Sequence, residues 1–155
     1  MRTRRRVWHA ALLAAAIGVA GCGSASPGSA PAYRIDTRTI DGLGKIITDG
    51  KGFTLYMYAP DHRAAPRCTG FCAQQWPPLL LPSRISKPTA GPGVVTSLLG
   101  AVRRPDGRLQ ATYNGWPLYL WVGDTAPGQA TGQADDMGLW YAVSVTGAVD
   151  RGTPR

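Results

Sequence analysis

Alternating side chains mark one stretch of the chain as a strand with two apolar faces. In residues 52–61, GFTLYMYAPD, Leu55 and Met57 fall on one face of an extended strand, while Tyr56 and Tyr58 fall on the other. A strand that meets water on one face alternates apolar with polar residues, and this stretch does not. We therefore predict that both faces are covered and that the strand lies at the centre of the domain.

The same pattern returns in residues 115–124, GWPLYLWVGD. Aligning Gly52 with Gly115 matches the Leu-Tyr pair and the closing Asp of the two stretches, and further on Trp76 meets Trp140 after a slip of one residue. Agreement at a nearly constant spacing indicates an internal duplication.

The residues before each copy predict tight hairpins. The stretches 46–52, IITDGKG, and 110–115, QATYNG, each carry an apolar or β-branched run into Asp-Gly or Asn-Gly, dipeptides that tolerate positive φ. A Pro-Asp-Gly turn at 105–107 adds a further strand to the second copy. The one helix candidate is residues 68–76, CTGFCAQQW.

These elements predict an all-β fold with little helix. We expect two duplicated β-meander units, at about 40–80 and 98–147, packed as one pseudo-two-fold sandwich or barrel-like domain that spans residues 33–150. One half of about 60 residues buries too little surface to be comfortable alone, so the pair is expected to share one core.

The first 21 residues predict an export signal. Four arginines precede a weakly apolar run at residues 7–20, which is too short for a permanent membrane-spanning helix. Residues 19–22, VAGC, resemble the cleavage site of bacterial lipoproteins, so 1–21 would be removed and Cys22 lipidated. The arginine cluster also resembles a twin-arginine motif, which leaves the export route open.

The residues after that cysteine predict a short tether. Residues 23–32 contain only Gly, Ser, Ala and Pro, so 22–32 is interpreted as the lipidated Cys and a flexible linker. We expect a protein anchored by lipid to the extracytoplasmic face of the cell membrane. Whether that is an inner or an outer membrane stays open.

The charge narrows the classes of partner. The formal net charge of +8 halves once the four signal arginines leave, because 13 basic residues then face nine Asp and no Glu. This excess is compatible with anionic lipid or a cell-wall polymer nearby. The basic residues are scattered and form no stripe, so no nucleic-acid partner is expected.

Two short motifs carry a resemblance to a known family. They share a Tyr-x-aromatic-x-x-Asp pattern and are formed by Tyr56, Tyr58 and Asp61 and by Tyr119, Trp121 and Asp124. With the segment CTGFCAQQWPPL after the first copy, the chain resembles the bacterial secreted-repeat lipoproteins with a Y-x-[FWY]-x-x-D motif over roughly residues 40–147. The resemblance implies a location and an architecture, whereas the function of that family is not established.

Cys68 and Cys72 form a C-x-x-x-C pair in a chain predicted to be exported, where thiols usually end as disulfides. A bridge would pin the loop between Asp61 and Trp76. The alternative is a redox or metal site in which His62 and Asp61 join the two cysteines as further ligands, a set that suits a soft or borderline ion. The spacing matches no strong zinc signature, and no cofactor is expected.

Asp61 and Asp124 each follow an aromatic strand and open a loop. In the structural interpretation the carboxylate accepts backbone N–H bonds or a tyrosine hydroxyl from the partner repeat. In the catalytic alternative the two carboxylates act as acid and base in glycoside hydrolysis. The loop 123–138 is interpreted as a solvated connection, although its three aspartates would suit calcium if the loop folded inward.

Tyr113 and Trp116 flank the Asn-Gly turn of the second copy. A turn tip is hard to bury, so exposed rings there could stack on an envelope glycan or on a partner protein.

The leading functional prediction is a membrane-anchored, non-enzymatic envelope lipoprotein with a binding or structural role. A redox or metal-handling lipoprotein that uses Cys68, Cys72 and His62 is the alternative. A hydrolase ranks last, because one His and no Glu follow the signal and no Gly-x-Ser-x-Gly or His-Glu-x-x-His motif occurs.

Overall fold

The computed structural model describes residues 30–61 and 65–149. The predictions for residues 1–21, for Cys22, for most of the tether and for His62 therefore lie outside the described residues. Within that part of the chain, no helix is long and apolar enough to cross a bilayer.

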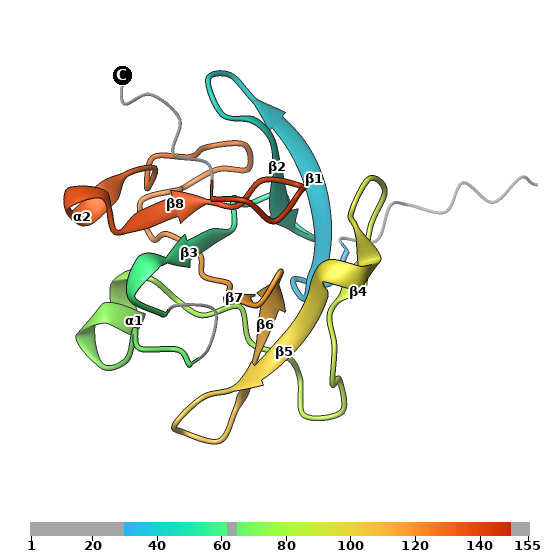
Figure 1. Cartoon of the computed structure of the whole chain (residues 1–155), viewed down its shortest axis with the longest axis vertical. Helices are drawn as coiled ribbons and strands as arrows, with labels where there is room; N and C mark the ends of the chain where they lie inside the picture. Colours follow the sequence, from blue (N-terminus) through green and yellow to red (C-terminus); the bar gives the residue numbers. More distant parts are fainter. Residues whose placement is uncertain (1–29, 62–64, 150–155) are drawn as a thin grey trace, which may run out of the picture.

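Short strands dominate the structure, as predicted. They form three small sheets with the orders β2-β1-β4, β3-β8 and β5-β6-β7. The strands are β1 (Arg34–Ile40), β2 (Gly44–Asp49), β3 (Tyr56–Tyr58), β4 (Thr89–Ala90), β5 (Leu99–Arg103), β6 (Leu109–Tyr113), β7 (Trp116–Pro117) and β8 (Trp140–Ala142). Two short helices, α1 (Phe71–Gln75) and α2 (Asp135–Gly138), lie on one side of the domain (Figure 1).

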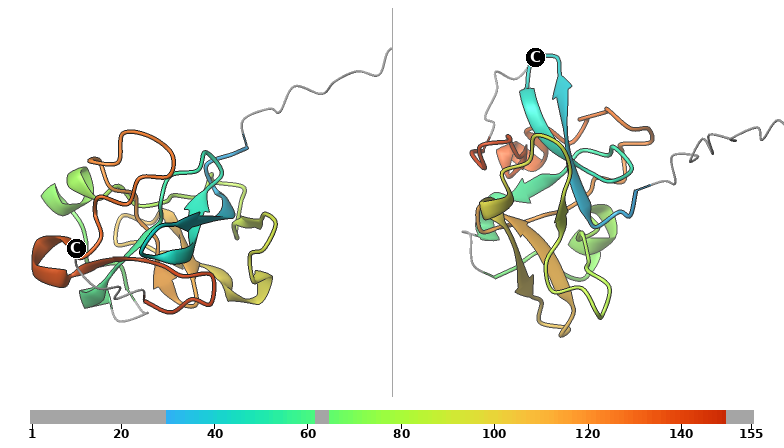
Figure 2. Two further views of the ribbon diagram at one scale, coloured as in Figure 1. Left: turned by 90° about the horizontal axis from the view of Figure 1, so that it is seen from above. Right: turned by 90° about the vertical axis from the view of Figure 1, so that its right-hand side faces the viewer.

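The two halves repeat the same hairpin. In the first half β1 pairs antiparallel with β2, and Ile35 faces Asp49. In the second half β5 pairs antiparallel with β6, and Leu99 faces Tyr113, so both partners lie 64 positions later in the chain. The two hairpins extend toward opposite ends of the molecule (Figure 2).

The two motif strands meet at the centre, as the two apolar faces predicted. The backbone N–H of Tyr56 donates to the carbonyl of Tyr119 over 2.9 Å, and the N–H of Tyr119 donates back to the carbonyl of Tyr56 over 2.9 Å. This reciprocal pair is the signature of a pseudo-two-fold axis, an intrachain form of an isologous contact.

Each face of the central pair packs against its own cluster of buried side chains. Leu55, Met57 and Leu118 belong to an aliphatic cluster that includes Ile35, Ile47 and Val143. Tyr56 and Tyr119 belong to an aromatic cluster that includes Trp76 and Trp140. Because the pleat sends alternate residues to opposite sides, the Leu-Tyr alternation divides one chain between two cores.

The loop 123–138, interpreted from the sequence as a solvated connection, contains one short regular element. It ends in α2, which stands 64 positions after α1 and is therefore its counterpart in the second half. Ala134, Asp136 and Met137 have φ values of 59°, 52° and 57°, so α2 is a tight turn built largely from left-handed residues. The turn signal of the loop, Pro127-Gly128, lies well before α2, and residues 134–137, ADDM, contain no Gly, Pro or Asn, which explains why the pattern alone missed this turn.

Candidate functional site

The two motif aspartates close a reciprocal network across the axis. The hydroxyl of Tyr119 donates to Asp61 over 2.8 Å, and the hydroxyl of Tyr56 donates to Asp124 over 2.7 Å. Each tyrosine therefore binds the carboxylate of the other repeat. This is the arrangement that the structural interpretation of the aspartates proposed.

Backbone N–H groups complete both carboxylates. Asp61 also accepts the N–H of Arg67 over 2.7 Å, and Asp124 accepts the N–H of Thr131 over 2.8 Å. Asp61 is 1% exposed and Asp124 is 6% exposed. Both side chains are thus enclosed and committed to bonds within the domain.

Burial, reinforced by the neighbouring carboxylate, raises the pKa of the Tyr56 and Tyr119 hydroxyls well above the ordinary value. The phenols therefore stay protonated and act as donors. Burial also raises the pKa of Asp61, although the Arg67 N–H, the Tyr119 hydroxyl and the Arg104 charge oppose that shift.

The raised pKa of Asp61 predicts a pH-dependent cost for its replacement. The folded chain binds the carboxyl proton of Asp61 more tightly than the unfolded chain does. Protonation of Asp61 therefore contributes its full share to the free energy of unfolding below a pH of about 4, and this share is lost as pH rises through the raised pKa. We expect Asp61→Asn to destabilise the chain less at pH 7 than at pH 4, as measured by urea unfolding.

Asp106→Asn is the matched control for that measurement. Arg108 lowers the pKa of the exposed Asp106 carboxyl, so this replacement should cost no less at pH 7 than at pH 4. A cost of Asp61→Asn that grew from pH 4 to pH 7 would contradict the direction assigned to Asp61.

Four aromatic rings form a continuous stack beside this network. Trp76 and Trp140 stack at the middle with their ring centroids 3.9 Å apart and their planes 2° apart. Tyr58 stacks on Trp140 and Trp121 stacks on Trp76, each with centroids 4.3 Å apart. The repeat motif thus supplies the outer rings, and the two tryptophans that aligned in the sequence supply the inner ones.

The network tyrosines contact the stack edge-on. The centroids of Tyr56 and Trp76 lie 5.3 Å apart at 79°, and those of Tyr119 and Trp140 lie 5.2 Å apart at 86°. Such T-shaped contacts place the positive edge of one ring on the negative face of another. Gly132 leaves the necessary space, because a Cβ built there would come within 2.6 Å of the Trp76 ring.

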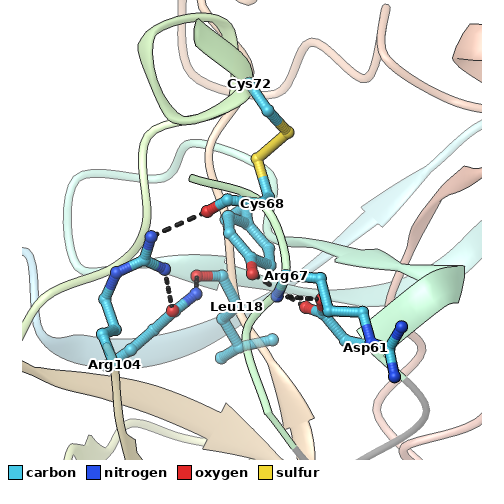
Figure 3. Close-up of a disulfide and its surroundings, with 8 residues drawn as sticks. Asp61, Arg67, Cys68, Cys72, Arg104 and Leu118 are labelled. Atoms are coloured by element: carbon cyan, nitrogen blue, oxygen red, sulfur yellow. Dashed lines mark hydrogen bonds between the residues drawn. A yellow bond between two sulfur atoms is a disulfide. The ribbon is translucent and has the colours of Figure 1, made fainter. Parts of the chain in front are cut away.

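The predicted disulfide is present. Cys68 and Cys72 are bonded, and their Cα atoms lie 5.3 Å apart (Figure 3). The bridge ties Cys72, in α1, to Cys68. Cys68 follows Arg67, and the backbone N–H of Arg67 donates to Asp61. In this oxidised form neither sulfur is a thiolate.

Loss of the disulfide is expected to lower the free energy of unfolding by about 2 kcal/mol, from the entropy of closing so short a loop. Guanidinium unfolding with and without a reductant measures this cost. The double variant Cys68→Ser, Cys72→Ser should match the reduced chain and should not respond to reductant. A reductant response in that variant would mean that something other than this bridge is being reduced.

A buried arginine that the sequence did not single out completes this region. Arg104 is 4% exposed, and its guanidinium donates to the carbonyl of Cys68 over 2.7 Å and to the side-chain oxygen of Gln110 (Figure 3). Gln110 in turn donates to the carbonyl of Leu118 over 2.8 Å. Neighbouring Arg103 has the same chemistry and is exposed, so only the strand register distinguishes the two.

The expectation of an aromatic pair at the turn tip is wrong for Tyr113. Tyr113 is fully buried, its hydroxyl donates to the carbonyl of Val145 over 2.8 Å, and it accepts the N–H of Val95. Trp116 is half-buried against the aliphatic cluster. Gly115 at the tip of the turn is exposed, while Asn114 donates to the carbonyl of Gly147, and the segment around Val145 and Gly147 covers Tyr113.

Within residues 30–61 and 65–149, no three His, Cys, Asp or Glu side chains come together as metal ligands. Asp124 faces the Tyr56 hydroxyl rather than the two aspartates of α2.

Comparison with known proteins agrees with the duplication. A family model described as a secreted repeat of unknown function matches the chain twice, over residues 37–80 and 100–144. Searches of curated proteins and of solved structures returned no match.

Proposed function

We propose, from the premise that this chain belongs to the family of secreted repeats of unknown function, that it is a lipid-anchored envelope protein with a non-enzymatic binding or structural role. A secreted repeat is consistent with such a protein outside the cytoplasm. The anchor, the membrane and the binding role are our proposal.

One observation carries this proposal: the tyrosines and aspartates of the two Tyr-x-aromatic-x-x-Asp stretches lie in the interior of the domain. The two aspartates and the two tyrosines that bind them are buried, and they satisfy one another across the pseudo-two-fold axis. A buried, mutually satisfied polar network rigidifies a core and specifies one packing. The repeated tyrosines and aspartates therefore have a structural role, and we assign the function of the protein to residues on its surface.

The anchor rests on the sequence of the first 32 residues. Cys22 would carry the lipid, and the Gly, Ser, Ala and Pro linker would hold the β domain near the extracytoplasmic face of the membrane. A surface-held domain of this kind meets envelope glycans and envelope proteins as its partners.

Labelling the full chain in bacterial cells with radioactive palmitate tests the anchor. We expect label on the protein, recovery in the membrane fraction and digestion by protease added outside the cytoplasm. Cys22→Ser should abolish the label and release the protein, while Cys72→Ser should keep both properties. Membrane recovery without label in the Cys22→Ser variant would contradict lipid anchoring.

A complementation experiment distinguishes a structural role of Asp61 and Asp124 from a catalytic role. A deletion phenotype should be restored by Asp61→Asn and by Asp124→Asn in proportion to the amount of folded protein at the surface. Full surface abundance without restoration would favour the acid–base alternative.

The alternative redox or metal-handling role has one supporting observation, the Cys68–Cys72 bond, because a disulfide can exchange with thiols. Native mass spectrometry of the full chain, purified without chelators, separates the roles. A mass two units below the reduced chain and free of adduct agrees with a structural bridge. A full-thiol mass with bound metal would move the function to Cys68, Cys72 and His62.

A further inference from the structure

Two arms that the pseudo-two-fold axis relates form one end of the domain. The first arm, residues 65–75, leads through α1 to one inner tryptophan of the ring stack, and the second arm, residues 129–139, leads through α2 to the other. Each arm donates one backbone N–H to the motif aspartate of its own repeat, from Arg67 in the first arm and from Thr131 in the second. The two helices therefore flank the axis on the same side of the domain (Figure 1).

Exposed apolar side chains gather at this end. Phe71 in α1 is 74% exposed and Met137 in α2 is 96% exposed. Val122 is 48% exposed, and its N–H donates to the carbonyl of Gln75, the last residue of α1. Among residues 30–61 and 65–149, Val95 is the one other large apolar side chain that is exposed. A single exposed apolar residue is ordinary, whereas a group at one end of a molecule marks an interaction surface.

Met137 adopts an unfavourable backbone conformation at this surface. Its φ of 57° lies in the left-handed region, which a bulky side chain rarely adopts. Its side chain is almost wholly exposed, so burial within the described domain does not offset the strain. Strain of this kind is retained where a residue has a role in binding.

The two arms carry opposite charges. Arg67 is the one charged residue of the first arm, whereas Asp135 and Asp136 are the two of the second, and both Arg67 and Asp136 are exposed. Burial and then the charge of Asp136 raise the pKa of Tyr58, so this carboxylate lies near the outer ring of the stack. Neither Arg67 nor Asp136 forms a salt bridge with another described residue.

A second copy of the chain matches this surface when it is turned about an axis perpendicular to the pseudo-two-fold axis. The rotation brings the two ends face to face and sets the first arm of each copy opposite the second arm of the other. Phe71 then meets Met137 of the second copy in an aromatic–sulfur contact, and Arg67 meets Asp136 of the second copy. The other face-to-face arrangement opposes Arg67 to Arg67 and Asp136 to Asp136. Charge therefore selects one isologous dimer.

A lipid surface matches this end less well. Residues 30–33 enter the domain beside β1, on the side away from α1 and α2 (Figures 1 and 2), so the proposed anchor leaves this end accessible. The two aspartates of the second arm also oppose an anionic bilayer surface.

We propose that this end of the domain binds a second copy of the chain, with the first arm of each copy on the second arm of the other. Phe71 and Met137 supply the apolar contacts, and Arg67 and Asp136 supply the two equivalent ion pairs. This inference rests on the proposed binding role and names its partner; anchoring is tested separately by palmitate labelling, so the two proposals fail by different measurements.

An exchange of charges tests the arrangement by native mass spectrometry of the full chain, with detergent micelles in large excess over protein. The wild-type chain should show a monomer–dimer equilibrium. Arg67→Asp and Asp136→Arg should each weaken the dimer by about tenfold or more, because each reverses one charge in both ion pairs. A mixture of the two variants should recover a heterodimer, in which both contacts again join opposite charges. Arg84→Asp and Asp41→Arg make the same changes at exposed positions outside the arms and should leave the equilibrium unchanged.

The apolar contacts have their own test. Phe71→Ser and Met137→Ser should each weaken the dimer by about tenfold, whereas Val95→Ser should not. Hydrogen peroxide reports on the same contact, because it transfers one oxygen atom to an accessible methionine sulfur and leaves water. Met137 should be oxidised about threefold or more slowly in the wild-type dimer than in the Arg67→Asp variant. Buried Met57 should resist oxidation in both.

Three outcomes would overturn the proposal. The first is a wild-type chain that stays monomeric, or a dimer that neither charge reversal weakens. The second is the absence of a heterodimer from the mixture of Arg67→Asp and Asp136→Arg chains. The third is protection of Met137 from peroxide that requires phosphatidylglycerol vesicles and persists in both charge variants, because lipid would then occupy this end of the domain.

Discussion

Replacing Trp140 with alanine is expected to lower the free energy of unfolding by about 4 kcal/mol, the largest effect of any single replacement considered for this protein. Trp140 is 1% exposed and is held between the rings of Tyr58 and Trp76, and the Tyr119 ring contacts it at an interplanar angle of 86°. The replacement removes one inner ring of the stack and leaves a cavity where the two halves meet. Unfolding in guanidinium measures the loss.

Trp121→Ala is the matched control. It removes the same side chain from the end of the stack, where Trp121 is half-buried and contacts only Trp76 among the stacked rings. We expect a cost of about 1–2 kcal/mol, because less apolar surface is lost. Trp140→Phe, which keeps a ring at the axis, should fall between the two. Equal costs for Trp140→Ala and Trp121→Ala would show that the axis isn't the energetic centre of the core.

Breaking one tyrosine–aspartate pair is expected to give the second-largest effect. Asp61→Ala leaves the Tyr119 hydroxyl and the Arg67 N–H without their acceptor in a buried site, with an expected cost of about 3 kcal/mol. Tyr119→Phe should cost less, because Asp61 keeps its backbone donor. In the double variant the costs should not add, and the coupling energy should reach about 1.5–3 kcal/mol as for other hydrogen bonds to a charged group.

The pseudo-two-fold axis supplies the control for that cycle. Tyr56 and Asp124 form the equivalent pair with nearly the same length, 2.7 Å against 2.8 Å. The Tyr56–Asp124 cycle should therefore return a similar coupling energy, and a Tyr56–Asp61 cycle should return one near zero. Strong coupling in the mismatched cycle would contradict the reciprocal arrangement.

The repeated strand was the most informative part of the sequence. Its Leu-Tyr alternation, apolar on both sides, predicted a central strand, and the structure places Leu55 and Tyr56 in two different buried clusters. The alignment of Trp76 with Trp140 predicted that the two tryptophans occupy equivalent positions in the two repeats, and their rings stack at the centre of the fold. The cysteine pair in a chain predicted to be exported indicated a disulfide, and that prediction is confirmed.

The outcome at Tyr113 depends on residues far away in the chain. Its turn carries an ordinary Asn-Gly signal, and nothing in the neighbouring residues shows that the hairpin around Gly147 covers it. Arg104 is similar, because its partners, Cys68 and Gln110, come from a loop of the first half and from the next strand. The local sequence pattern indicates which faces of a strand are apolar. Whether one polar side chain is buried depends on which distant segment of the chain packs over it.

The sequence by itself determined the duplication, the all-β class and the two-sided central strands, because each follows from spacing and periodicity within a few tens of residues, and it made a disulfide the leading interpretation of the cysteine pair. Tertiary structure alone decided which tyrosine binds which aspartate, the order of the four stacked rings, and the burial of Tyr113 and Arg104. The physical reason is that these features require contacts between the two halves, and a hydrogen bond or a ring stack across a pseudo-two-fold axis leaves no periodic trace in either half.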